Sequence, residues 1–566
     1  MKFIIISGGV LSGLGKGVTS ASIGLLLKSR GIKVTAMKCD MYLNIDAGTM
    51  NPIEHGEVFV TDDGVETDQD LGHYERFLGI NLTRENYTTN GQIYKLVLDK
   101  ERSLDYDGKC VEPYHHLPPE IIKKWYLAGE KHNADVVLVE LGGTVGEYEG
   151  LLFFESIRRL KLMCPKDVIL VHVGYLPAPP SIGELKSKPL QQSVGQLNSL
   201  GLMPDFIVCR SEKAVDEKRK GKIALASGLA IENIVSNPDV DSIYEVPLIL
   251  EKQGFAQKII KKLRLKHHKK DLSAWINLNK SIKKAKKELK IGIVGKYQKT
   301  GDYVLTDSYV CVVEALKHAG WKLGVKVKMI WIDSEEKSPD YENLDGIIVP
   351  QGWGKRGIEG KINAVRYARE NNIPYLGLCF GMQMAVIEFA RNVLGLKNAN
   401  SIEVDPETKY PVIHIMPNQK EYLTKKQYGG TIRLGSWPCI LKKGSKLAKI
   451  YNSIQENPDL IGDELNADMS SFFRGIPRSL ERGGCHNDRN VIHERHRHRY
   501  EFNNTYKEKF EKAGMVFSGT SPDGKLIEAI ELTNHKFFIG TQYHPEYISR
   551  PLTPHPIFVS FLSSMI

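Results

Sequence analysis

The sequence predicts an α/β protein with two domains, each built on a parallel sheet. Short apolar runs that end in glycine or an acidic residue alternate with helix-length segments, which is typical of parallel strands joined by helices. The pattern stops at a strongly basic stretch and then begins again. The 566 residues are also too many for one hydrophobic core. We expect domains over 1–255 and 291–566, joined by a basic linker over 256–290.

Four apolar runs predict the main strands of the first domain. They read "FIIISGG", "KVTAMKCD", "DVVLVELGG" and "DVILVHVGY", with helix-length segments such as 19–30 and 119–131 between them. Ligands of open parallel sheets bind outside the carboxyl ends of the strands. The glycines and acidic residues that follow these runs are therefore expected at one edge of the sheet.

The second domain is predicted from four further runs. "LKIGIVGKY", "KVKMIWI", "LDGIIVPQGWG" and "IPYLGLCFG" read as strands that end in loops. Residues 458–490 break the pattern with several glycines and charges, and we expect a surface insertion there.

Composition places the chain among ordinary globular proteins, with 42% hydrophobic and 25% charged residues. The eight cysteines show no paired spacing, which favours a reducing compartment over a disulfide framework. The first residues are too short an apolar run for a secretory signal, and no run approaches the length of a membrane span. We therefore expect a soluble, cytoplasmic protein that does not bind a membrane.

The net charge of +10 is concentrated in one segment. Residues 258–290 contain thirteen Lys and Arg against Asp271 and Glu288, so the rest of the chain is close to neutral. A solvated, partly helical linker is the preferred interpretation, and a nucleic-acid or membrane patch is the alternative. The segment lacks the interleaved aromatic residues of single-strand binders. We expect no nucleic-acid partner.

A glycine-rich stretch, "SGGVLSGLGKGVTS", follows the first strand and opens a helix. Glycines let backbone N–H groups surround phosphate oxygens, the helix N-terminus adds positive charge, and Lys16 can reach the outer phosphates. The spacing is not that of the standard P-loop, and Gly17 stands where a magnesium-binding hydroxyl is usual. A glycine-rich turn with a surface lysine is the alternative, but the position between strand and helix favours a phosphate site.

A phosphate loop without that hydroxyl needs carboxylates elsewhere to hold magnesium. Asp70 lies in "TDQDLGHYERF" and Glu140 ends the run "VELGG". Magnesium is bound through one or two carboxylates together with phosphate oxygens and water, so these two acids are the candidate ligands. Each alone would more often be a solvated surface charge. Residues 186–189, "KSKP", and Lys222 are further cations that could face a second polyanion.

Cys379 lies in "YLGLCFGMQ", between two glycines at an expected strand-to-helix turn. Such a turn exposes the sulfur, and the helix N-terminus favours the thiolate and can bind an oxyanion. In "YHPE", His544 precedes Glu546 by two residues, so a carboxylate can orient the imidazole that takes the thiol proton. The turn over 349–357 offers backbone donors. A buried, inert cysteine is the alternative.

These motifs resemble known families. The second half resembles the class I glutamine amidotransferases, and nearly the whole chain resembles the cytidine triphosphate (CTP) synthase family. The resemblance is carried by "SGGVLSGLGKG", "NIDAGTMNPIEHGEVFVTDDG", "DLGHYERF", "VELGGTVGE", "KSKP", "YLGLCFGMQ", "RHRHRYEFNN" and "YHPE". It implies a P-loop-like nucleotide-binding synthase domain followed by a class I glutamine amidotransferase domain.

The resemblance also implies roles for individual residues. The glutaminase site would use the triad Cys379, His544 and Glu546, with oxyanion and glutamine contacts from Gly352, Phe380, Gln383, Glu403 and Arg499. The ATP site would comprise Gly13, Leu14, Gly15, Lys16, Gly17, Val18, Asp70, Asp239 and Val240, with Asp70 and Glu140 as the Mg²⁺ ligands. UTP or CTP would contact Ser12, Glu147, Tyr148, Glu149, Lys186, Lys188, Gln191 and Lys222. An ammonia passage would be lined by His55 and Val58.

The implied reaction is the ATP-dependent amination of UTP to CTP, a step of pyrimidine nucleotide biosynthesis, with ammonia released from L-glutamine and channelled between domains. Members of the family are typically activated by GTP and inhibited by CTP, and they assemble as homotetramers from dimers; filaments are also possible. A stand-alone glutaminase or thiol hydrolase would leave the phosphate loop unexplained. A non-catalytic nucleotide-binding filament former would leave the triad unexplained.

The chain departs from the family pattern at several places. Gln351-Gly352 replaces two glycines, and a side chain at position 351 would strain the turn if positive φ were required there. The stretch around 112–119 also differs, and Met41 stands where proline is usual. We expect these departures to affect regulation and assembly more than the chemistry.

Overall fold

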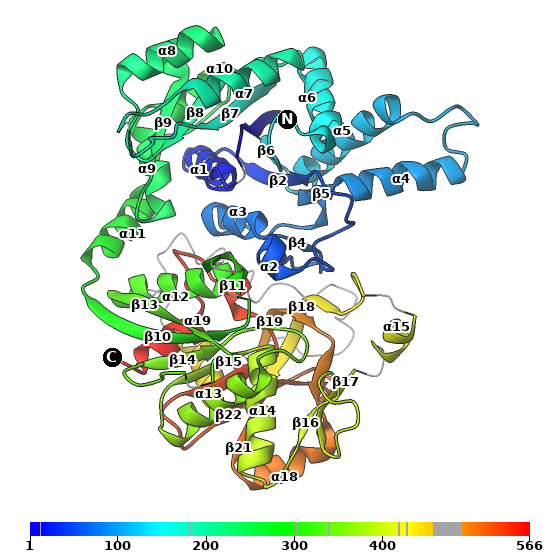
Figure 1. Cartoon of the computed structure of the whole chain (residues 1–566), viewed down its shortest axis with the longest axis vertical. Helices are drawn as coiled ribbons and strands as arrows, with labels where there is room; N and C mark the ends of the chain where they lie inside the picture. The colour runs from blue at the N-terminus through cyan, green and yellow to red at the C-terminus, as the bar shows by residue number, and fades with distance from the viewer. Residues whose placement is uncertain are drawn as a thin grey trace. The chain divides into compact units, whose positions relative to one another are not determined.

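The computed structural model describes residues 1–11, 13–181, 183–297, 299–300, 303–304, 306–337, 339–416, 419–425, 428–456 and 490–566. It forms two compact units, one of Met1–Ala47 with Asp70–Asn279 and one of Gly48–Gln69 with Lys280–Ile566 (Figure 1). The predicted α/β class is confirmed, because each unit contains a sheet with parallel strands and helices. Residues 48–69 pack with the second unit, which the sequence pattern did not indicate.

The first unit is built on a seven-stranded sheet in the order β5-β2-β6-β1-β7-β8-β9, and its neighbouring strands are parallel. The strands are β1 (Lys2–Gly8), β2 (Val34–Asp40), β5 (Tyr87–Thr89), β6 (Val136–Leu141), β7 (Val168–Tyr175), β8 (Phe206–Ser211) and β9 (Ile234–Pro238). The continuous apolar runs are buried on both faces, as expected for strands covered by helices on each side. The four predicted strands are all present.

Helices connect these strands (Figure 1). They are α1 (Lys16–Lys28), α3 (Asp70–Leu78), α4 (Asn90–Arg102), α5 (Pro113–Lys131), α6 (Leu151–Met163), α7 (Lys188–Ser199), α8 (Glu217–Ser227), α9 (Val246–Lys252), α10 (Phe255–Leu263) and α11 (Ser273–Lys284), with short 3-10 turns at Arg84–Asn86, Tyr148–Gly150, Ile231–Asn233 and Ile243–Glu245. In the basic segment, α10 buries Phe255, Ile259 and Leu263 and exposes Lys261 and Lys262. Lysines there form the solvated face of an amphipathic helix.

The second unit contains a nine-stranded sheet in the order β13-β10-β14-β15-β23-β22-β21-β18-β19. The strands are β13 (Val325–Asp333), β10 (Lys287–Gly295), β14 (Gly346–Val349), β15 (Tyr375–Leu378), β23 (Phe538–Thr541), β22 (Ile527–Leu532), β21 (Met515–Thr520), β18 (Arg433–Leu441) and β19 (Val491–His498). The first five are parallel, whereas β22, β21, β18 and β19 join antiparallel to their neighbours. This antiparallel extension adds to the predicted parallel sheet.

Smaller elements complete the second unit. Its short strands are β3 (Val58–Val60), β4 (Glu66–Asp68), β11 (Lys299–Thr300), β12 (Tyr303–Val304), β16 (Asn400–Ser401), β17 (Pro411–Ile415) and β20 (Tyr500–Phe502). Its helices are α2 (Pro52–His55), α12 (Val310–Leu323), α13 (Ile358–Glu370), α14 (Phe380–Asn392), α15 (Lys420–Thr424), α16 (Lys446–Glu456), α18 (Lys507–Lys512) and α19 (Pro556–Ser563), with 3-10 turns at Thr306–Tyr309, Asn504–Tyr506 and Pro545–Ile548.

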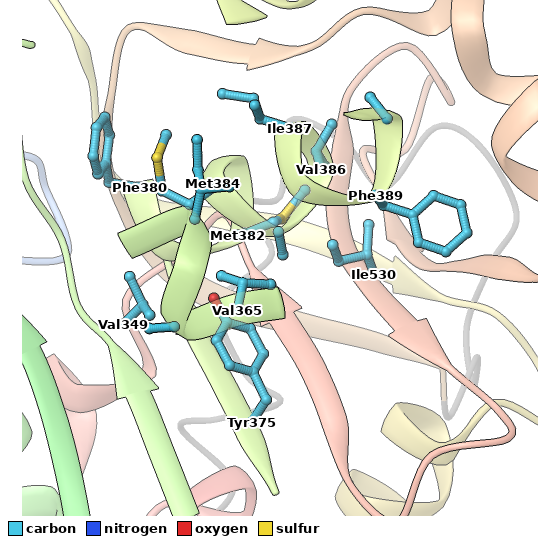
Figure 2. Packing of buried hydrophobic residues seen from close by; sticks show 14 of the residues in the cluster. Val349, Val365, Tyr375, Phe380, Met382, Met384, Val386, Ile387, Phe389 and Ile530 are labelled. Carbon is cyan, nitrogen blue, oxygen red and sulfur yellow. The ribbon is translucent and has the colours of Figure 1, made fainter. Parts of the chain in front are cut away.

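Helix α14 lies at the centre of a hydrophobic core of the second unit (Figure 2). Every residue from Phe380 to Ala390 is buried, which is typical of a helix covered on all sides. Met382 and Met384 belong to the same buried cluster as Val349 of β14, Val365 of α13 and Tyr375 of β15. This packing fixes the N-terminus of α14, where Cys379 lies.

Within the part of the chain that the structure describes, no helix combines the length and the apolar character that crossing a bilayer requires.

Candidate active sites

Cys379 occupies a sharp turn between β15 and α14. Its backbone has φ 51° and ψ −99°, a left-handed region that a non-glycine residue adopts only at a cost of about 1–3 kcal/mol. The turn is held because the Cys379 N–H donates to the carbonyl of Thr541 at 2.7 Å. Such strain is the geometry expected of a nucleophile elbow, in which the side chain is lifted out of the strand.

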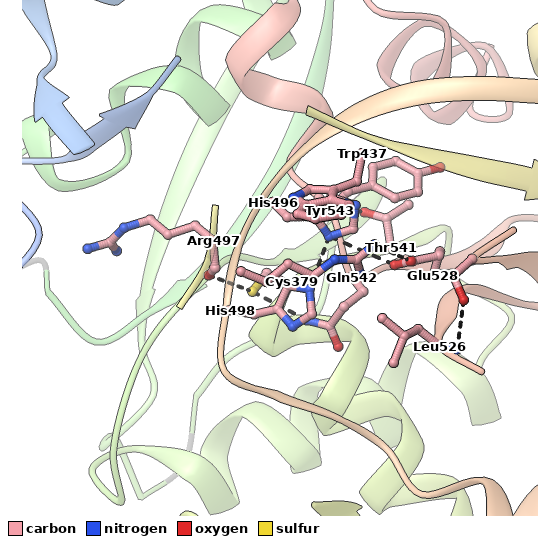
Figure 3. Close-up of polar contacts among 12 residues, drawn as sticks. Cys379, Trp437, His496, Arg497, His498, Leu526, Glu528, Thr541, Gln542 and Tyr543 are labelled. Carbon is pink, nitrogen blue, oxygen red and sulfur yellow. Dashed lines mark hydrogen bonds and ion pairs between the residues drawn. The ribbon is translucent and has the colours of Figure 1, made fainter. Parts of the chain in front are cut away.

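The sulfur of Cys379 lies among polar groups from two neighbouring segments. Gln542 Nε2 donates to Sγ at 3.5 Å, and Sγ lies 3.7 Å from the carbonyl oxygen of Arg497 (Figure 3). Cys379 is only 5% exposed. The thiol is therefore held in one orientation.

His544 and Glu546 are brought together as predicted. His544 Nδ1 and Glu546 Oε1 are 2.8 Å apart, and both side chains are buried. Burial alone would lower the pKa of His544, but the charges of Glu546 and Cys379 outweigh it and raise that pKa to about 10. His544 also stacks on Tyr547, with ring centroids 4.8 Å apart. The imidazole is thus oriented by a carboxylate and favours its protonated form.

A pocket joins the residues expected at the glutaminase site. Its lining includes Cys379, His544 and the five residues expected to contact glutamine: Gly352, Phe380, Gln383, Glu403 and Arg499. Gln351, Trp353, Arg497, His498 and Tyr500 also line it. The pocket therefore brings a sulfur nucleophile, an imidazole, a carboxylate and an arginine to one cavity.

The polar groups of this pocket are positioned by their own hydrogen bonds. Glu403 Oε1 accepts from the N–H of Gly354 at 2.7 Å. Gln383 Nε2 donates to the Tyr500 carbonyl at 3.0 Å, and Arg499 donates to Thr431 Oγ1 at 2.9 Å. Together with Arg499, a carboxylate and an amide held in this way can recognise the ammonium and carboxylate groups of an amino acid.

The turn after β14 is supported by two lysines. Lys361 is fully buried and donates to the Pro350 carbonyl at 3.0 Å. Burial holds its pKa well below the ordinary value, the nearby Lys296 lowers it further, and Cys379 acts in the opposite direction. Lys296 donates to the carbonyls of Trp353 and of Gly354, the latter at 3.0 Å. Sequence reasoning missed both lysines, because an isolated lysine carries no signal of burial.

Position 351 does not show the strain that a required positive φ would cause. Gln351 is absent from the non-glycine residues with positive φ in the described part of the chain. The side chain is buried, and its Nε2 donates to Glu57 Oε1 at 2.7 Å. The departure from two glycines is therefore accommodated by a specific hydrogen bond.

The predicted passage residues lie in the segment that packs with the second unit. His55 ends α2, with Nε2 3.8 Å from Asp68 Oδ2. Val58 begins β3, is buried, and accepts a hydrogen bond from Tyr547 Oη at its carbonyl, at 3.1 Å. Two ion pairs also hold the β3–β4 hairpin: Arg495 with Asp62 at 2.5 Å and Arg497 with Glu66 at 2.8 Å.

Three ligand-type side chains near the pocket could hold a metal by their spacing. His496, His498 and Glu528 are all buried, and their ligand atoms lie within 4.8 Å of one another. Arg433, however, pairs with Glu528 at 2.8 Å, and burial together with Arg433 holds the pKa of both histidines well below its usual range. A fixed positive charge beside the group disfavours a cation, so we assign it a structural role.

The glycine-rich loop of the first unit has the predicted form. Gly13 and Gly15 have φ of 70° and 76°, and Gly15 caps α1, so side chains at both positions would be strained. Lys16 is buried and donates to the Gly143 carbonyl at 2.8 Å. Gly17 and Val18 belong to the first turn of α1, and Leu14 is buried beside them. Ser12 lies outside the described residues.

Asp70 and Glu140 lie next to this helix terminus. A Cβ placed on Gly17 would collide with Asp70 and lie 3.6 Å from Glu140, which explains why position 17 lacks a side chain. Lys38 pairs with Asp70 and lies 3.5 Å from Glu140. Burial and the neighbouring Asp70 raise the pKa of Glu140 to about 7. Two carboxylates that repel each other, beside a helix terminus that is expected to bind phosphate, fit a Mg²⁺ ion.

The expected UTP or CTP residues are distributed over several elements. Glu147, Tyr148 and Glu149 surround the 3-10 turn after β6, and Tyr148 is 85% exposed. Lys188 begins α7, Gln191 donates to Ser187 at 3.0 Å, and Lys186 lies 3.8 Å from Glu184. Lys222 is exposed on α8. The joint role of these residues stays a prediction.

Asp239 follows β9, with Val240 next to it, and lies 2.7 Å from Arg210. Arg210 also donates to the carbonyls of Asn237 and Pro238, and its Nε would lie 3.7 Å from a Cβ on Gly15. The expected adenine contact is thus linked to the phosphate loop by an arginine that sequence reasoning missed.

Most of the expected insertion at 458–490 lies outside the described residues.

Comparisons with known proteins agree on the family over the whole length. Residues 2–265 match the model of the CTP synthase N-terminus, and residues 304–564 match that of class I glutamine amidotransferases. The CTP synthase of Sulfolobus acidocaldarius is 49% identical, with 99% of each chain covered. That of Bacillus subtilis is 45% identical over 100% of this chain and 98% of the relative.

Among solved structures, the glutaminase domain of Trypanosoma brucei CTPS with bound acivicin is 33% identical. It covers 49% of this chain and 93% of its own, with a TM-score of 0.39. The Sulfolobus relative is close to half identical over nearly the whole chain, and the models of both domains match in the same order. These two findings establish the family. The chain belongs to the CTP synthase family.

Proposed function

We propose that the protein converts UTP to CTP with ammonia taken from L-glutamine, at the expense of ATP. The full-length similarity to CTP synthases carries this proposal, because it covers both the nucleotide loop and the glutaminase pocket. The enzyme is then a carbon–nitrogen ligase of pyrimidine nucleotide biosynthesis with glutamine as amido donor.

In the glutaminase reaction, Cys379 attacks the amide carbon of glutamine as the thiolate. The protonated His544 supplies the proton that lets ammonia leave, and Glu546 stabilises the charged imidazole. Backbone donors at the N-terminus of α14 and at Gly352 receive the oxygen of the tetrahedral intermediate. His544 then takes a proton from water, which hydrolyses the thioester and releases glutamate.

In the synthase reaction, ATP phosphorylates the 4-oxygen of UTP, which turns a poor leaving group into a good one. Ammonia attacks the same carbon and phosphate leaves. Lys16 and the N-terminal N–H groups of α1 stabilise the charge on the transferred phosphoryl group. When bound, Mg²⁺ neutralises phosphate oxygens, and Asp70 and Glu140 would hold it. Lys38 keeps these two carboxylates in place.

The finer features of the family are proposed for this chain in the same way. Ammonia passes His55 and Val58 without entering bulk water, where it would be protonated. GTP activates the glutaminase reaction, CTP inhibits the synthase reaction, and the chain assembles as a homotetramer, with filaments as a further possible assembly. We place the protein in the cytoplasm.

The decisive experiment supplies the protein with UTP, ATP, magnesium and glutamine labelled with ¹⁵N at the amide. We expect CTP that carries the label at its 4-amino group. Release of labelled ammonia without labelled CTP, under all nucleotide conditions, would leave only a glutaminase and contradict the proposal.

A further inference from the structure

The carboxylate of Glu57 is buried beneath the glutaminase pocket. Its side chain belongs to the segment over 48–69 and is 1% exposed. Oε2 accepts the N–H of Cys311 at 2.6 Å, near the start of α12, and Oε1 accepts Gln351 Nε2 at 2.7 Å. A buried carboxylate of this kind depends on its hydrogen bonds, because removal of either donor leaves an oxygen without compensation.

Several groups of the described structure act on the charge of Glu57. They are Glu546, Cys311 and Gln351, with Tyr309 and Tyr547 also within electrostatic range. Burial and the negative charge of Glu546 raise the pKa of Glu57 to about 7, against the effect of the hydrogen bonds. Gln351 and Cys311 are thus the residues that donate hydrogen bonds to this carboxylate, Gln351 from its side-chain amide.

The same hairpin also reaches the catalytic base. Tyr547 Oη donates to the Val58 carbonyl at 3.1 Å, and the Tyr547 ring stacks on His544. The ring of Phe59 meets Tyr547 edge-on, with centroids 5.5 Å apart. The hairpin that follows Glu57 therefore contacts the imidazole side of the pocket through Tyr547, and Glu57 contacts the oxyanion side through Gln351.

We propose that Gln351 and Glu57 form a positioning pair that ties the segment over 48–69 to the oxyanion turn and keeps the turn in its catalytic geometry. Neither residue touches the reacting atoms. Gln351 precedes Gly352, whose N–H is the proposed oxyanion donor, so a shift of the Gln351 side chain moves that donor. The inference rests on the proposed glutaminase function of the pocket.

The pair also explains how this chain tolerates a side chain at position 351. The backbone there does not require positive φ, so the carboxamide extends from the turn and satisfies Glu57 Oε1. The oxyanion turn thereby gains a connection to the segment that carries His55 and Val58. Glutamine hydrolysis thus depends on the position of the residues expected to lead ammonia away.

A double-mutant cycle tests the pair in the full-length enzyme. Gln351→Ala, Glu57→Gln and their combination are compared for kcat and KM of glutamine hydrolysis and for ammonia-dependent CTP formation. We expect each single change to lower kcat about tenfold, the double change to be no worse than the poorer single change, and KM to stay within about twofold. Ammonia-dependent CTP formation stays at the wild-type rate.

Two further variants make the result specific. Glu57→Gln combined with Gln351→Glu exchanges donor and acceptor, and we expect kcat to return to within about threefold of wild type. Gln253→Ala is the matched control, because Gln253 Nε2 donates to the Ser236 carbonyl at 2.7 Å, remote in the chain from the pocket. It removes the same amide group, and we expect unchanged kcat for glutamine hydrolysis.

Strictly additive losses in kcat, or a folded Gln351→Ala enzyme with wild-type kcat, would overturn the pair. If Gln351→Ala does not fold, Gln351→Gly is measured in its place and judged by the same criteria. Cys379→Ala distinguishes a failure of the proposed glutaminase site from a failure of the positioning pair. Hydrolysis that survives Cys379→Ala refutes the proposed glutaminase site, whereas its loss together with an additive cycle refutes only the positioning pair.

Discussion

The two candidate sites of this enzyme are built in different ways. The glutaminase pocket is made of side chains that are buried and fixed by hydrogen bonds, and its nucleophile lies on a strained turn. The nucleotide loop is rich in glycine, and Val10 and Leu11 within it are 40% and 49% exposed. Its charged side chains interact with one another and with a backbone carbonyl: Lys38 with Asp70 and Glu140, and Lys16 with Gly143.

This difference teaches how each reaction obtains its rate. Amide cleavage depends on a nucleophile and a base aligned within the protein, so preorganised side chains are the main contribution. Phosphoryl transfer depends on charge placed around the substrate phosphates, so backbone donors and cations are the main contribution. Substitutions in the glutaminase pocket should therefore lower glutamine-dependent CTP formation and spare ammonia-dependent formation. Substitutions in the nucleotide loop should affect both.

The largest effect is expected for Cys379→Ala. Glutamine-dependent CTP formation should fall by about 10⁴-fold or more, because the covalent route is lost, while ammonia-dependent formation persists. Both rates are measured by CTP absorbance. Cys439→Ala is the matched control, because this cysteine is fully buried in the core and its pKa is well above the usual value. Loss of both activities in a folded Cys379→Ala enzyme would contradict the separation of the sites.

Lys16→Ala tests the other site. We expect both glutamine- and ammonia-dependent CTP formation to fall by about 10²–10³-fold, because the charge on the phosphoryl group is no longer stabilised. Glutamine hydrolysis itself should persist. The exposed Lys33 provides the control Lys33→Ala, which should leave all three rates unchanged. Retained ammonia-dependent turnover in Lys16→Ala would remove the argument for a phosphate loop.

A smaller effect is expected for Lys361→Met, which removes the buried donor to Pro350. We expect kcat of glutamine hydrolysis to fall about tenfold with little change in KM, because the oxyanion turn loses one support. Arg366→Met changes an exposed cation of the same helix and is the control. An equal loss in both variants would point to a general effect on α13 rather than to the turn.

The smallest effect concerns stability rather than turnover. His172 lies beneath the glycine-rich loop, with Nδ1 3.0 Å from Ser7 Oγ and Nε2 2.9 Å from Ser193 Oγ. Burial, with a contribution from Lys16, lowers its pKa to about 4. A histidine with a lowered folded-state pKa stabilises the fold above its unfolded pKa near 6.5, and this stability is lost as pH falls towards 4.

We therefore expect the unfolding free energy of the first unit to decrease by up to about 3 kcal/mol between pH 6.5 and pH 4 through His172. His172→Asn should flatten this dependence, as measured by urea denaturation followed by tryptophan fluorescence. The exposed His267 gives the control His267→Asn, which should keep the wild-type slope. Identical slopes in all three proteins would exclude His172 as the responsible group.

Sequence reasoning succeeded where a local pattern determines local structure. The strands, the loop before Lys16, the turn at Cys379 and the pairing of His544 with Glu546 all follow from short stretches of sequence, and the structure contains each of them. Lys38, Arg210 and Lys361 were missed because their burial depends on residues far away in the chain. The antiparallel edge of the second sheet also depends on long-range pairing, between β18, β21 and β22.

The expected strain at Gln351 also shows that a local sequence pattern does not reveal long-range contacts. A rule about glycine turns raised the question, but the answer depended on the backbone angle and on Glu57, which lies almost three hundred residues earlier. Local rules identify positions where a special solution is needed. They do not reveal which distant residue supplies it.

Because residues 48–69 pack with the second unit, a cut at the linker separates that unit from one of its own segments. A fragment that begins at residue 291 would lack Asp62 and Glu66, the carboxylates that pair with Arg495 and Arg497. An engineer who wants a free-standing amide-cleaving module must therefore graft this short stretch back as a second piece.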